Sequence, residues 1–347
     1  MNDTKARSSL LMIYTGGTIG MKEDASDQTL KPFDFSQILS EVPELGKFAS
    51  SIDSYTFDPL IDSSDVDPAM WVSLAEIIRD RYDGYDGFIV LHGTDTMAYS
   101  ASALSFMLSG LGKPVIFTGS QLPIGKPRTD GKENLISAVE IAAAKDEAGM
   151  AMVPEVCIFF DSRLLRGNRC TKVNSEGFEA FDSPNCPPLA EAGISIRYDS
   201  KNIIHPAAGT PFSIHPELDT RVSILKLHPG ITPQVVRDIL LGERTRAVII
   251  ETYGSGNSLS SEWFLDIVRE SSAAGKILVN VSQCMRGRVD MNIYATGKKL
   301  QDAGVIGACD STTESALGKL FHLMGIYADN DLVKEKFQEN LRGEISK

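Results

Sequence analysis

Cysteine is scarce in this sequence, and its few copies are scattered. The chain of 347 residues contains five, none of them in a Cys-x-x-Cys pair: Cys157, Cys170, Cys186, Cys284 and Cys309. An odd number of widely spaced cysteines argues against a disulfide scaffold and a structural zinc site, and it fits a reduced cytoplasmic setting. The five histidines form no metal-like cluster, and three of them precede proline. We therefore expect neither a metal nor another cofactor.

Long apolar runs and basic patches are missing as well. The first apolar stretch, Leu10–Tyr14, is too short for the core of a signal peptide, and no stretch approaches the length of a membrane span. The 34 basic residues are scattered among 46 acidic ones, which gives a net charge of −12. We therefore expect a cytoplasmic protein without a membrane or nucleic-acid partner.

The apolar residues that are present follow a regular alternation. Hydrophobic residues make up 42% of the chain, and its length suits about two domains. We predict strands and helices at the following positions: strands Leu10–Tyr14, Gly87–Leu91, Pro114–Thr118 and Glu155–Phe160, and helices Pro68–Tyr82, Thr96–Leu108 and Lys132–Lys145. This alternation predicts a doubly wound, largely parallel α/β sheet in an N-terminal domain, residues 1–198.

A proline-rich stretch, residues 199–220, interrupts the alternation. It contains two His-Pro pairs and one Thr-Pro pair, which is typical of an extended interdomain linker. The pattern then resumes with predicted strands Val222–Leu227, Ala247–Glu251 and Lys276–Val281, and predicted helices Pro233–Leu241, Ser261–Ser272 and Thr312–Leu323. We predict a second, smaller α/β domain over residues 221–347.

Two of the predicted strands end in turns that are rich in threonine and glycine. Leu10–Tyr14 runs into Thr15-Gly16-Gly17-Thr18, and Gly87–Leu91 runs into His92-Gly93-Thr94-Asp95-Thr96. Ligand clefts in α/β sheets open at the carboxyl ends of strands, so these turns predict a site. Their hydroxyls, one carboxylate and free backbone amides suggest acyl transfer to a hydroxyl, with Thr18 placed as a nucleophile.

Each turn also has a plainer interpretation. The first is typical of a simple turn or of the first half of a nucleotide loop, although it completes neither Gly-x-Gly-x-x-Gly nor a P-loop. In the second, Thr94 or Asp95 suits the N-cap of the following helix. His92 suits a histidine whose hydrogen bonds are satisfied at a strand end better than a catalytic base.

Two further segments carry groups that such a site needs. Asp62-Ser63-Ser64-Asp65 offers hydroxyls, carboxylates and amides for the two ends of an amino acid, although it also resembles the approach to a helix capped by Asp67. A threonine hydroxyl is a weak nucleophile and needs a nearby base or cation. No histidine is well placed along the sequence, so Lys172 is the candidate if it is buried; its plainer interpretation is a surface lysine.

Taken in order, these motifs resemble the bacterial asparaginase/glutaminase family, and most closely its cytoplasmic type I L-asparaginases. Further segments similar to that subgroup are Met97-Ala98-Tyr99, Gly119-Ser120-Gln121, Tyr253-Gly254-Ser255-Gly256-Asn257, Gln283-Cys284-Met285 and Tyr294-Ala295-Thr296-Gly297. The resemblance extends over nearly the whole chain. It implies hydrolysis of L-asparagine to L-aspartate and ammonia through a threonine acyl-enzyme.

The resemblance also implies a role for each candidate residue. Thr18 corresponds to the nucleophile. Thr94, Lys172 and Asp95 correspond to a supporting triad in which the lysine activates the threonine hydroxyl, and Asp95 corresponds also to a ligand of the substrate's α-amino group. The complete set has two parts: catalytic Thr18, Thr94, Asp95 and Lys172, and substrate-binding Asp62, Ser63, Ser64, Thr94, Asp95 and Ser120. Asp62 and Ser63, and after them Ser64, correspond to the holders of the α-carboxylate.

Assembly and regulation follow from the same resemblance. Sites of this family form between subunits, so a homodimer or homotetramer is implied, with Tyr253–Asn257 and Asp290 as candidates to reach a neighbouring copy. Some type I enzymes have an allosteric asparagine site, to which Thr171, Glu251 and Cys284 correspond. Glu251 stands where arginine is expected, and its charge would repel a second carboxylate.

The sequence departs from the family in the loop after the first threonine turn. That loop usually carries a tyrosine that closes over the nucleophile, but this chain has no tyrosine between Tyr14 and Tyr55. Thr29, in the loop Gly20–Asp34, is the candidate to replace it.

Two other functions stay open. The amidase component of a tRNA-dependent amidotransferase shares these motifs, although it normally has an additional N-terminal domain and the acidic charge disfavours an RNA-linked role. A non-catalytic protein that binds an amino acid or a nucleotide on the same fold is the other alternative.

Overall fold

The computed structural model describes residues 8–23, 30–32 and 41–346 and divides the chain into two compact units. One unit comprises Met1–Ser183 and Pro187–Ile214, and the other comprises Pro184–Cys186 and His215–Lys347. Thr29 lies outside the described residues. Among the residues that are described, no helix is both long and apolar enough to cross a bilayer.

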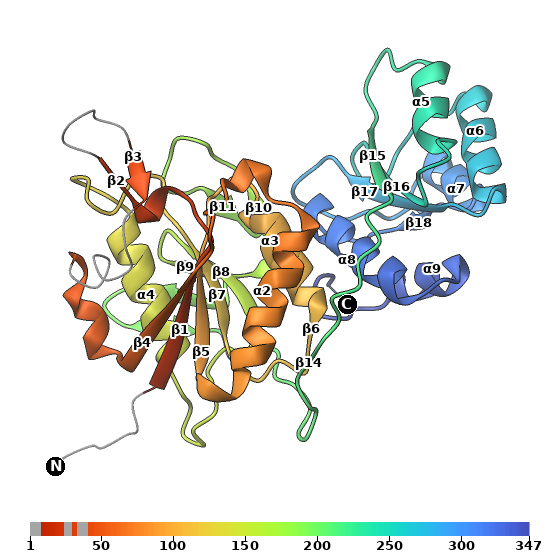
Figure 1. The fold of residues 1–347 in the computed structure, drawn as a ribbon. Helices are drawn as coiled ribbons and strands as arrows, with labels where there is room; N and C mark the ends of the chain where they lie inside the picture. The colour runs from red at the N-terminus through yellow and green to blue at the C-terminus, as the bar shows by residue number, and fades with distance from the viewer. Residues whose placement is uncertain (1–7, 24–29, 33–40, 347) are drawn as a thin grey trace. The chain divides into compact units, whose positions relative to one another are not determined.

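The first unit is built on an eight-stranded sheet (Figure 1). In spatial order its strands are β13 (Ile196–Tyr198), β12 (Ala190–Ala192), β9 (Arg163–Arg166), β8 (Val156–Phe160), β7 (Val115–Thr118), β5 (Gly87–Leu91), β1 (Ser8–Tyr14) and β4 (Ala49–Thr56). Five adjacent strands, β4, β1, β5, β7 and β8, run parallel. At the β8 side of the sheet, β9, β12 and β13 are each paired antiparallel. The predicted α/β class with a largely parallel sheet is therefore confirmed.

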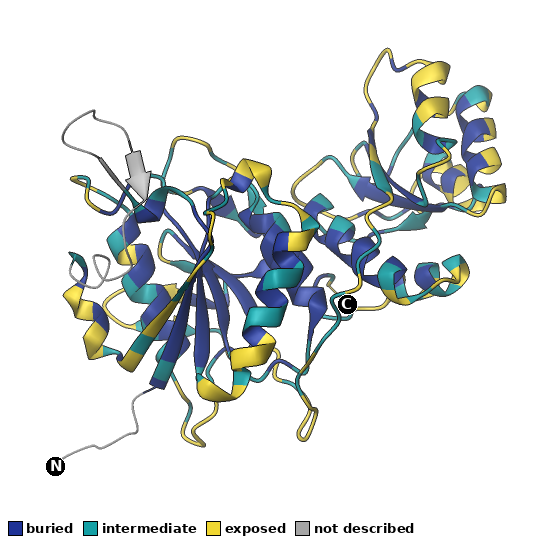
Figure 2. Ribbon diagram, viewed as in Figure 1, coloured by how far each residue is buried: buried dark blue, intermediate teal, exposed yellow. Residues whose placement is uncertain are grey.

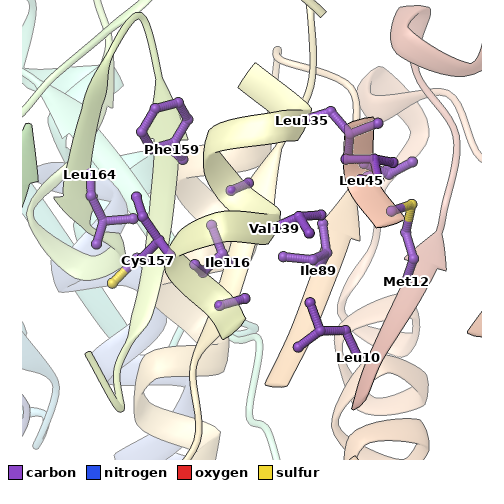
Figure 3. Close-up of a cluster of buried hydrophobic side chains, with 14 of the residues drawn as sticks. Leu10, Met12, Leu45, Ile89, Ile116, Leu135, Val139, Cys157, Phe159 and Leu164 are labelled. Carbon is purple, nitrogen blue, oxygen red and sulfur yellow. The ribbon is translucent and has the colours of Figure 1, made fainter. Parts of the chain in front are cut away.

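Helices cover both faces of this sheet, as Figure 1 shows. They are α2 (Pro68–Arg81), α3 (Met97–Met107) and α4 (Gly131–Ala143). Alternate side chains of a strand point to opposite faces, so Leu10 and Met12 of β1 pack with α4 through Leu135 and Val139 (Figure 3). Helix α3 is buried on nearly all sides, which its continuous run of small and apolar residues permits. Figure 2 shows the same burial along the central strands.

Short elements complete the first unit. The strands are β2 (Met21–Glu23), β3 (Leu30–Pro32), β6 (Leu108–Ser109), β10 (Thr171–Lys172), β11 (Phe181–Asp182) and β14 (Ser213–Ile214), and the 3₁₀ turns are η1 (Thr18–Gly20), η2 (Pro43–Lys47), η3 (Ser63–Asp65), η4 (Tyr82–Gly84) and η5 (Gly167–Arg169). Strand β14 pairs with β6, so the proline-rich stretch up to Ile214 belongs to the first unit.

The second unit has a four-stranded parallel sheet between two layers of helices. Its strands are β15 (Val222–Lys226), β16 (Ala247–Thr252), β17 (Ile277–Ser282) and β18 (Ile306–Gly307), and its helices are α5 (Pro233–Leu240), α6 (Glu262–Ala273), α7 (Ala295–Asp302), α8 (Thr313–Ile326) and α9 (Asn330–Gln338). Val248 and Ile250 face the α5–α6–α7 layer, while Ala247 and Ile249 face α8 and α9. The boundaries 1–198, 199–220 and 221–347 stay a prediction of where independently folding domains meet.

Candidate active site

The two threonine-rich turns lie side by side at the carboxyl edge of the large sheet. Strands β1 and β5 are parallel neighbours, with Tyr14 opposite Leu91. Both the backbone N–H and the hydroxyl of Thr15 donate to the carbonyl of Leu91, each at 3.0 Å. The turn that contains Thr18 is thereby fastened to the strand end that leads into His92 and Thr94.

Contact between two glycines brings the turns closer than side chains would allow. A Cβ on Gly17 would lie 2.5 Å from the backbone nitrogen of Gly93, and a Cβ on Gly93 would overlap the side chain of Ser63. Gly17 also has a φ of +93°, a conformation that L side chains rarely adopt. Glycine at these two positions is what lets three segments of the site meet.

Lys172 contacts the second turn directly. Its Nζ lies 2.8 Å from Oγ1 of Thr94 and 2.6 Å from Oδ1 of Asp95. The lysine is on the two-residue strand β10, which pairs with β11. Its side chain is 20% exposed, against 63% for Asp95, so the lysine lies beneath the aspartate. An amine held between a hydroxyl and a carboxylate can take a proton from that hydroxyl when the amine is neutral, and the carboxylate then balances the charge of the ammonium that forms.

The predicted helix cap in this turn is wrong. The N-cap of α3 is Thr96, which makes no side-chain capping hydrogen bond. The side chains of Thr94 and Asp95 turn to Lys172 instead, and the hydroxyl of Thr96 donates to the carbonyl of Ser63 at 2.6 Å. The polar groups are therefore used to build the site and not to cap the helix.

The segment Asp62–Ser64 forms the third side of the site. Asp62 Oδ1 accepts hydrogen bonds from the backbone N–H and the hydroxyl of Ser64, both at 2.9 Å, and these bonds lower the pKa of Asp62. Ser63 is buried, whereas Asp62 and Ser64 are exposed. The predicted cap at Asp67 is confirmed, because its carboxylate accepts from Met70 N–H at 3.1 Å.

Gln121, which follows Ser120 in the sequence, contacts the second turn. Ser120 is 3% exposed, and its buried hydroxyl has no hydrogen-bond partner among the described residues. Thr94 donates to Oε1 of Gln121 at 3.4 Å, and Nε2 of Gln121 donates to the carbonyl of Gly177 at 3.0 Å. The sequence pattern assigns no role to Gln121. Its position directly after Ser120 is the one signal in the sequence that could have pointed to it.

His92 belongs to a buried chain of hydrogen bonds. Nε1 of Trp71 donates to Oγ of Ser100 at 2.8 Å, and that hydroxyl lies 3.0 Å from Nε2 of His92. Indole N–H only donates, so the serine proton goes to Nε2 and the ring donates from Nδ1 to the carbonyl of Gly93, at 2.6 Å. Burial lowers the pKa of His92 to about 4. The expected satisfied histidine at a strand end is confirmed.

The three candidate allosteric residues are divided between the units. Thr171 is in β10 of the first unit, and the other two are near the carboxyl edge of the small sheet. Glu251 pairs with Lys226 at 3.1 Å and accepts from the hydroxyl of Thr313 at 2.7 Å. Cys284 is exposed just after β17. An allosteric role for this set stays a prediction.

Two family models match the chain in succession. "Asparaginase, N-terminal" matches residues 9–204, and "Glutaminase/Asparaginase C-terminal domain" matches residues 221–337. The chain belongs to the asparaginase family. As an asparaginase-family protein, it is 43% identical to L-asparaginase 1 of Escherichia coli strain K12 over 343 residues, which cover 98% of each chain.

Two further relatives place this asparaginase-family chain more finely. The structure of L-asparaginase I from Vibrio cholerae matches with a TM-score of 0.88 and 41% identity, over 98% of this chain and 100% of that one. A component of the glutamyl-tRNA(Gln) amidotransferase of Thermoplasma acidophilum is 32% identical over 340 residues, which are 96% of this chain and 79% of that protein. The similarity therefore supports an L-asparaginase, with the amidotransferase component as a lesser alternative.

Among the described residues, no group of three or more histidines, cysteines or carboxylates is placed to hold a metal ion.

Proposed function

We propose that this protein hydrolyses L-asparagine to L-aspartate and ammonia through an acyl-enzyme on Thr18. The observation that carries the proposal is Lys172 Nζ at 2.8 Å from Thr94 Oγ1, in a turn that is packed against the turn of Thr18 through Gly93 and Gly17. Family membership supplies the substrate class. The reaction requires no cofactor.

In the first step, the Thr18 hydroxyl attacks the side-chain carbonyl carbon of asparagine. Its proton passes by way of the Thr94 hydroxyl to the neutral amine of Lys172 and then to the leaving nitrogen, so that ammonia departs and an ester forms on Thr18. Backbone N–H groups of the two glycine-rich turns stabilise the oxyanion. Water then attacks the ester, and the same pair takes and returns the proton to release aspartate.

The charges around the two threonine turns suit an α-amino acid. Asp95 is exposed toward solvent and is assigned to the α-amino group, while the hydroxyls of Ser63 and Ser64 are assigned to the α-carboxylate. Asp62 shapes that segment through its bonds to Ser64. The hydroxyl of Ser120, which has no hydrogen-bond partner within residues 8–23, 30–32 and 41–346, is available to bind the substrate.

The proposal also covers the oligomeric state and the cellular compartment of the protein. We assign a homodimer or homotetramer in the cytoplasm, in which Tyr253–Asn257 and Asp290 reach the site of a neighbouring copy. The Tyr253–Asn257 turn is rigidly held, because Ser282 Oγ donates to the carbonyl of Gly254 at 2.6 Å and Asp290 N–H donates to that of Ser255 at 2.9 Å. Sedimentation with activity measured over one dilution series tests this; a fully active monomer would remove the shared site.

Ammonia release by the purified protein tests the function. We expect release from L-asparagine without added tRNA. Release that requires glutamate-charged tRNA would favour the amidotransferase component, and tight asparagine binding without release would favour a non-catalytic binding protein. Parallel assays with L-glutamine measure the preference between the two amides.

A further inference from the structure

We propose that Tyr14, the last residue of β1, is a positioning residue that fixes the main chain of Thr18. The inference rests on the proposed function, because it assigns Tyr14 a part in aligning the nucleophile. Tyr14 is 1% exposed and lies within the core between the sheet and α4. Its hydroxyl end, however, reaches the turn that carries Thr18.

Tyr14 contacts this turn on both sides of the nucleophile. Before Thr18, the Tyr14 hydroxyl donates to the carbonyl of Gly17 at 3.4 Å. After Thr18, Gly20 lies so close that a Cβ there would overlap Cζ and the hydroxyl oxygen of Tyr14. The 3₁₀ turn Thr18–Gly20 therefore rests on the end of this one aromatic side chain.

The hydrogen bond to Gly17 also sets the direction of a donor. The carbonyl of Gly17 and the N–H of Thr18 belong to one planar trans peptide, so they point in opposite directions. Because Tyr14 holds the carbonyl toward the core, the Thr18 N–H points away from the core. The hydroxyl can only act as a neutral donor over the working pH range, since burial raises the pKa of Tyr14 to about 12.

The second threonine turn is held in the same way, which supports this interpretation. There the Nδ1 of His92 donates to the carbonyl of Gly93 at 2.6 Å, one peptide before Thr94. Gly17 and Gly93 contact each other. Each of the two threonines thus follows a glycine whose carbonyl is held by a buried ring, and the backbones of the two glycines lie in close contact.

Removing only the hydroxyl tests the positioning role. Tyr14→Phe keeps the ring under Gly20, so we expect kcat to fall about fivefold to tenfold, as for one neutral hydrogen bond, while KM changes by less than about twofold. Tyr198→Phe is the matched control, because Tyr198 packs against the same core at the far strand β13. An unchanged kcat in Tyr14→Phe, or an equal fall in Tyr198→Phe, would overturn the proposal.

A second pair of variants tests the contact through the melting temperature, a measurement that does not depend on activity. Gly20→Ala forces a methyl group against Tyr14, so it should lower the melting temperature and reduce kcat by about a hundredfold through misplacement of Thr18. In a Tyr14→Leu background the same change should lower the melting temperature far less, because the ring that it strikes is gone. If Gly20→Ala lowers the melting temperature equally in the wild-type and Tyr14→Leu backgrounds, the contact is contradicted.

The two readouts separate this inference from the proposed function. A wild-type protein that releases no ammonia from asparagine refutes the function, and the melting-temperature cycle still decides whether Tyr14 supports the turn. An active wild type with an unaffected Tyr14→Phe refutes the positioning role alone.

Discussion

The Nζ of Lys172 lies 2.8 Å from the hydroxyl oxygen of Thr94, although 78 positions separate the two residues. The same nitrogen lies 2.6 Å from a carboxylate oxygen of Asp95. The neutral amine of Lys172 is therefore placed to take a proton from Thr94, and the neighbouring aspartate balances the charge that results. This contact connects strand β10 to the turn that follows strand β5.

Replacing Lys172 by methionine should lower kcat far more than it changes KM. The expected loss is about 10²- to 10⁴-fold, since the proposed role is proton transfer and not uniform binding. Steady-state ammonia release measures it. The control is Lys145→Met, which breaks a comparable ion pair with Asp86 (2.9 Å) at the other end of the sheet and should leave kcat near wild type. Equal behaviour of the two variants would make Lys172 an ordinary surface lysine.

Asp95→Asn should weaken substrate binding as well as the rate. The substitution replaces a charged contact to the α-amino group by a neutral one, and it removes the carboxylate that pairs with Lys172. An asparagine analogue without the amino group should bind wild type and variant almost equally by calorimetry. A variant that still discriminates strongly between the two ligands would show that Asp95 does not recognise the amino group.

Ser120→Ala should separate function from stability. In the part of the chain that the structure describes, the buried hydroxyl of Ser120 has no hydrogen-bond partner. Its removal therefore costs no bond observed there and should raise the free energy of unfolding by about 1 kcal/mol, or leave it unchanged. If the hydroxyl binds substrate, KM should rise about fivefold to tenfold. Urea unfolding and steady-state kinetics measure the two effects; a destabilised variant with unchanged KM would reverse the assignment.

Acid should destabilise the first unit through His92. Burial lowers its pKa from the ordinary value of 6.5 to about 4, so the unfolded chain takes up the proton first. The free energy of unfolding should fall as the pH drops below about 6.5, and the contribution of His92 should reach about 3 kcal/mol near pH 4. Urea unfolding at pH 7 and pH 4 measures this loss. His92→Gln should show a smaller loss by that amount; parallel losses in the two proteins would contradict it.

Much of the fold is predictable because burial on both faces leaves a strong pattern. Gly87–Leu91 is continuously apolar, and β5 has those bounds. Strand β4 is not predicted, because it lies at the sheet edge and its sequence, Ala49–Thr56, is mostly polar and exposed. Antiparallel strands β9, β12 and β13 are missed for a related reason, since each is only three or four residues long.

The site is less predictable because its contacts join distant segments. Strand ends identify the turns of Thr18 and Thr94, since parallel strands deliver their ends to one edge. The proximity of Lys172 depends on how β10 is placed after the antiparallel return of β9, which no local pattern specifies. The contacts of Gln121 and Tyr14 likewise depend on tertiary packing; the buried tyrosine resembles any core aromatic until its hydroxyl is seen beneath Gly17.

Turnover by Thr18→Ala tests the central claim most directly. Thr18 is half-buried on the short turn η1, so the loss of its hydroxyl and methyl should leave the fold intact, as circular dichroism and the melting temperature can check. Removal of a nucleophile from a cooperating set costs about four decades or more, so residual ammonia release from asparagine should be about 10⁻⁴ of wild type or less. A folded Thr18→Ala protein that keeps a tenth of the wild-type kcat would contradict the acyl-enzyme on Thr18.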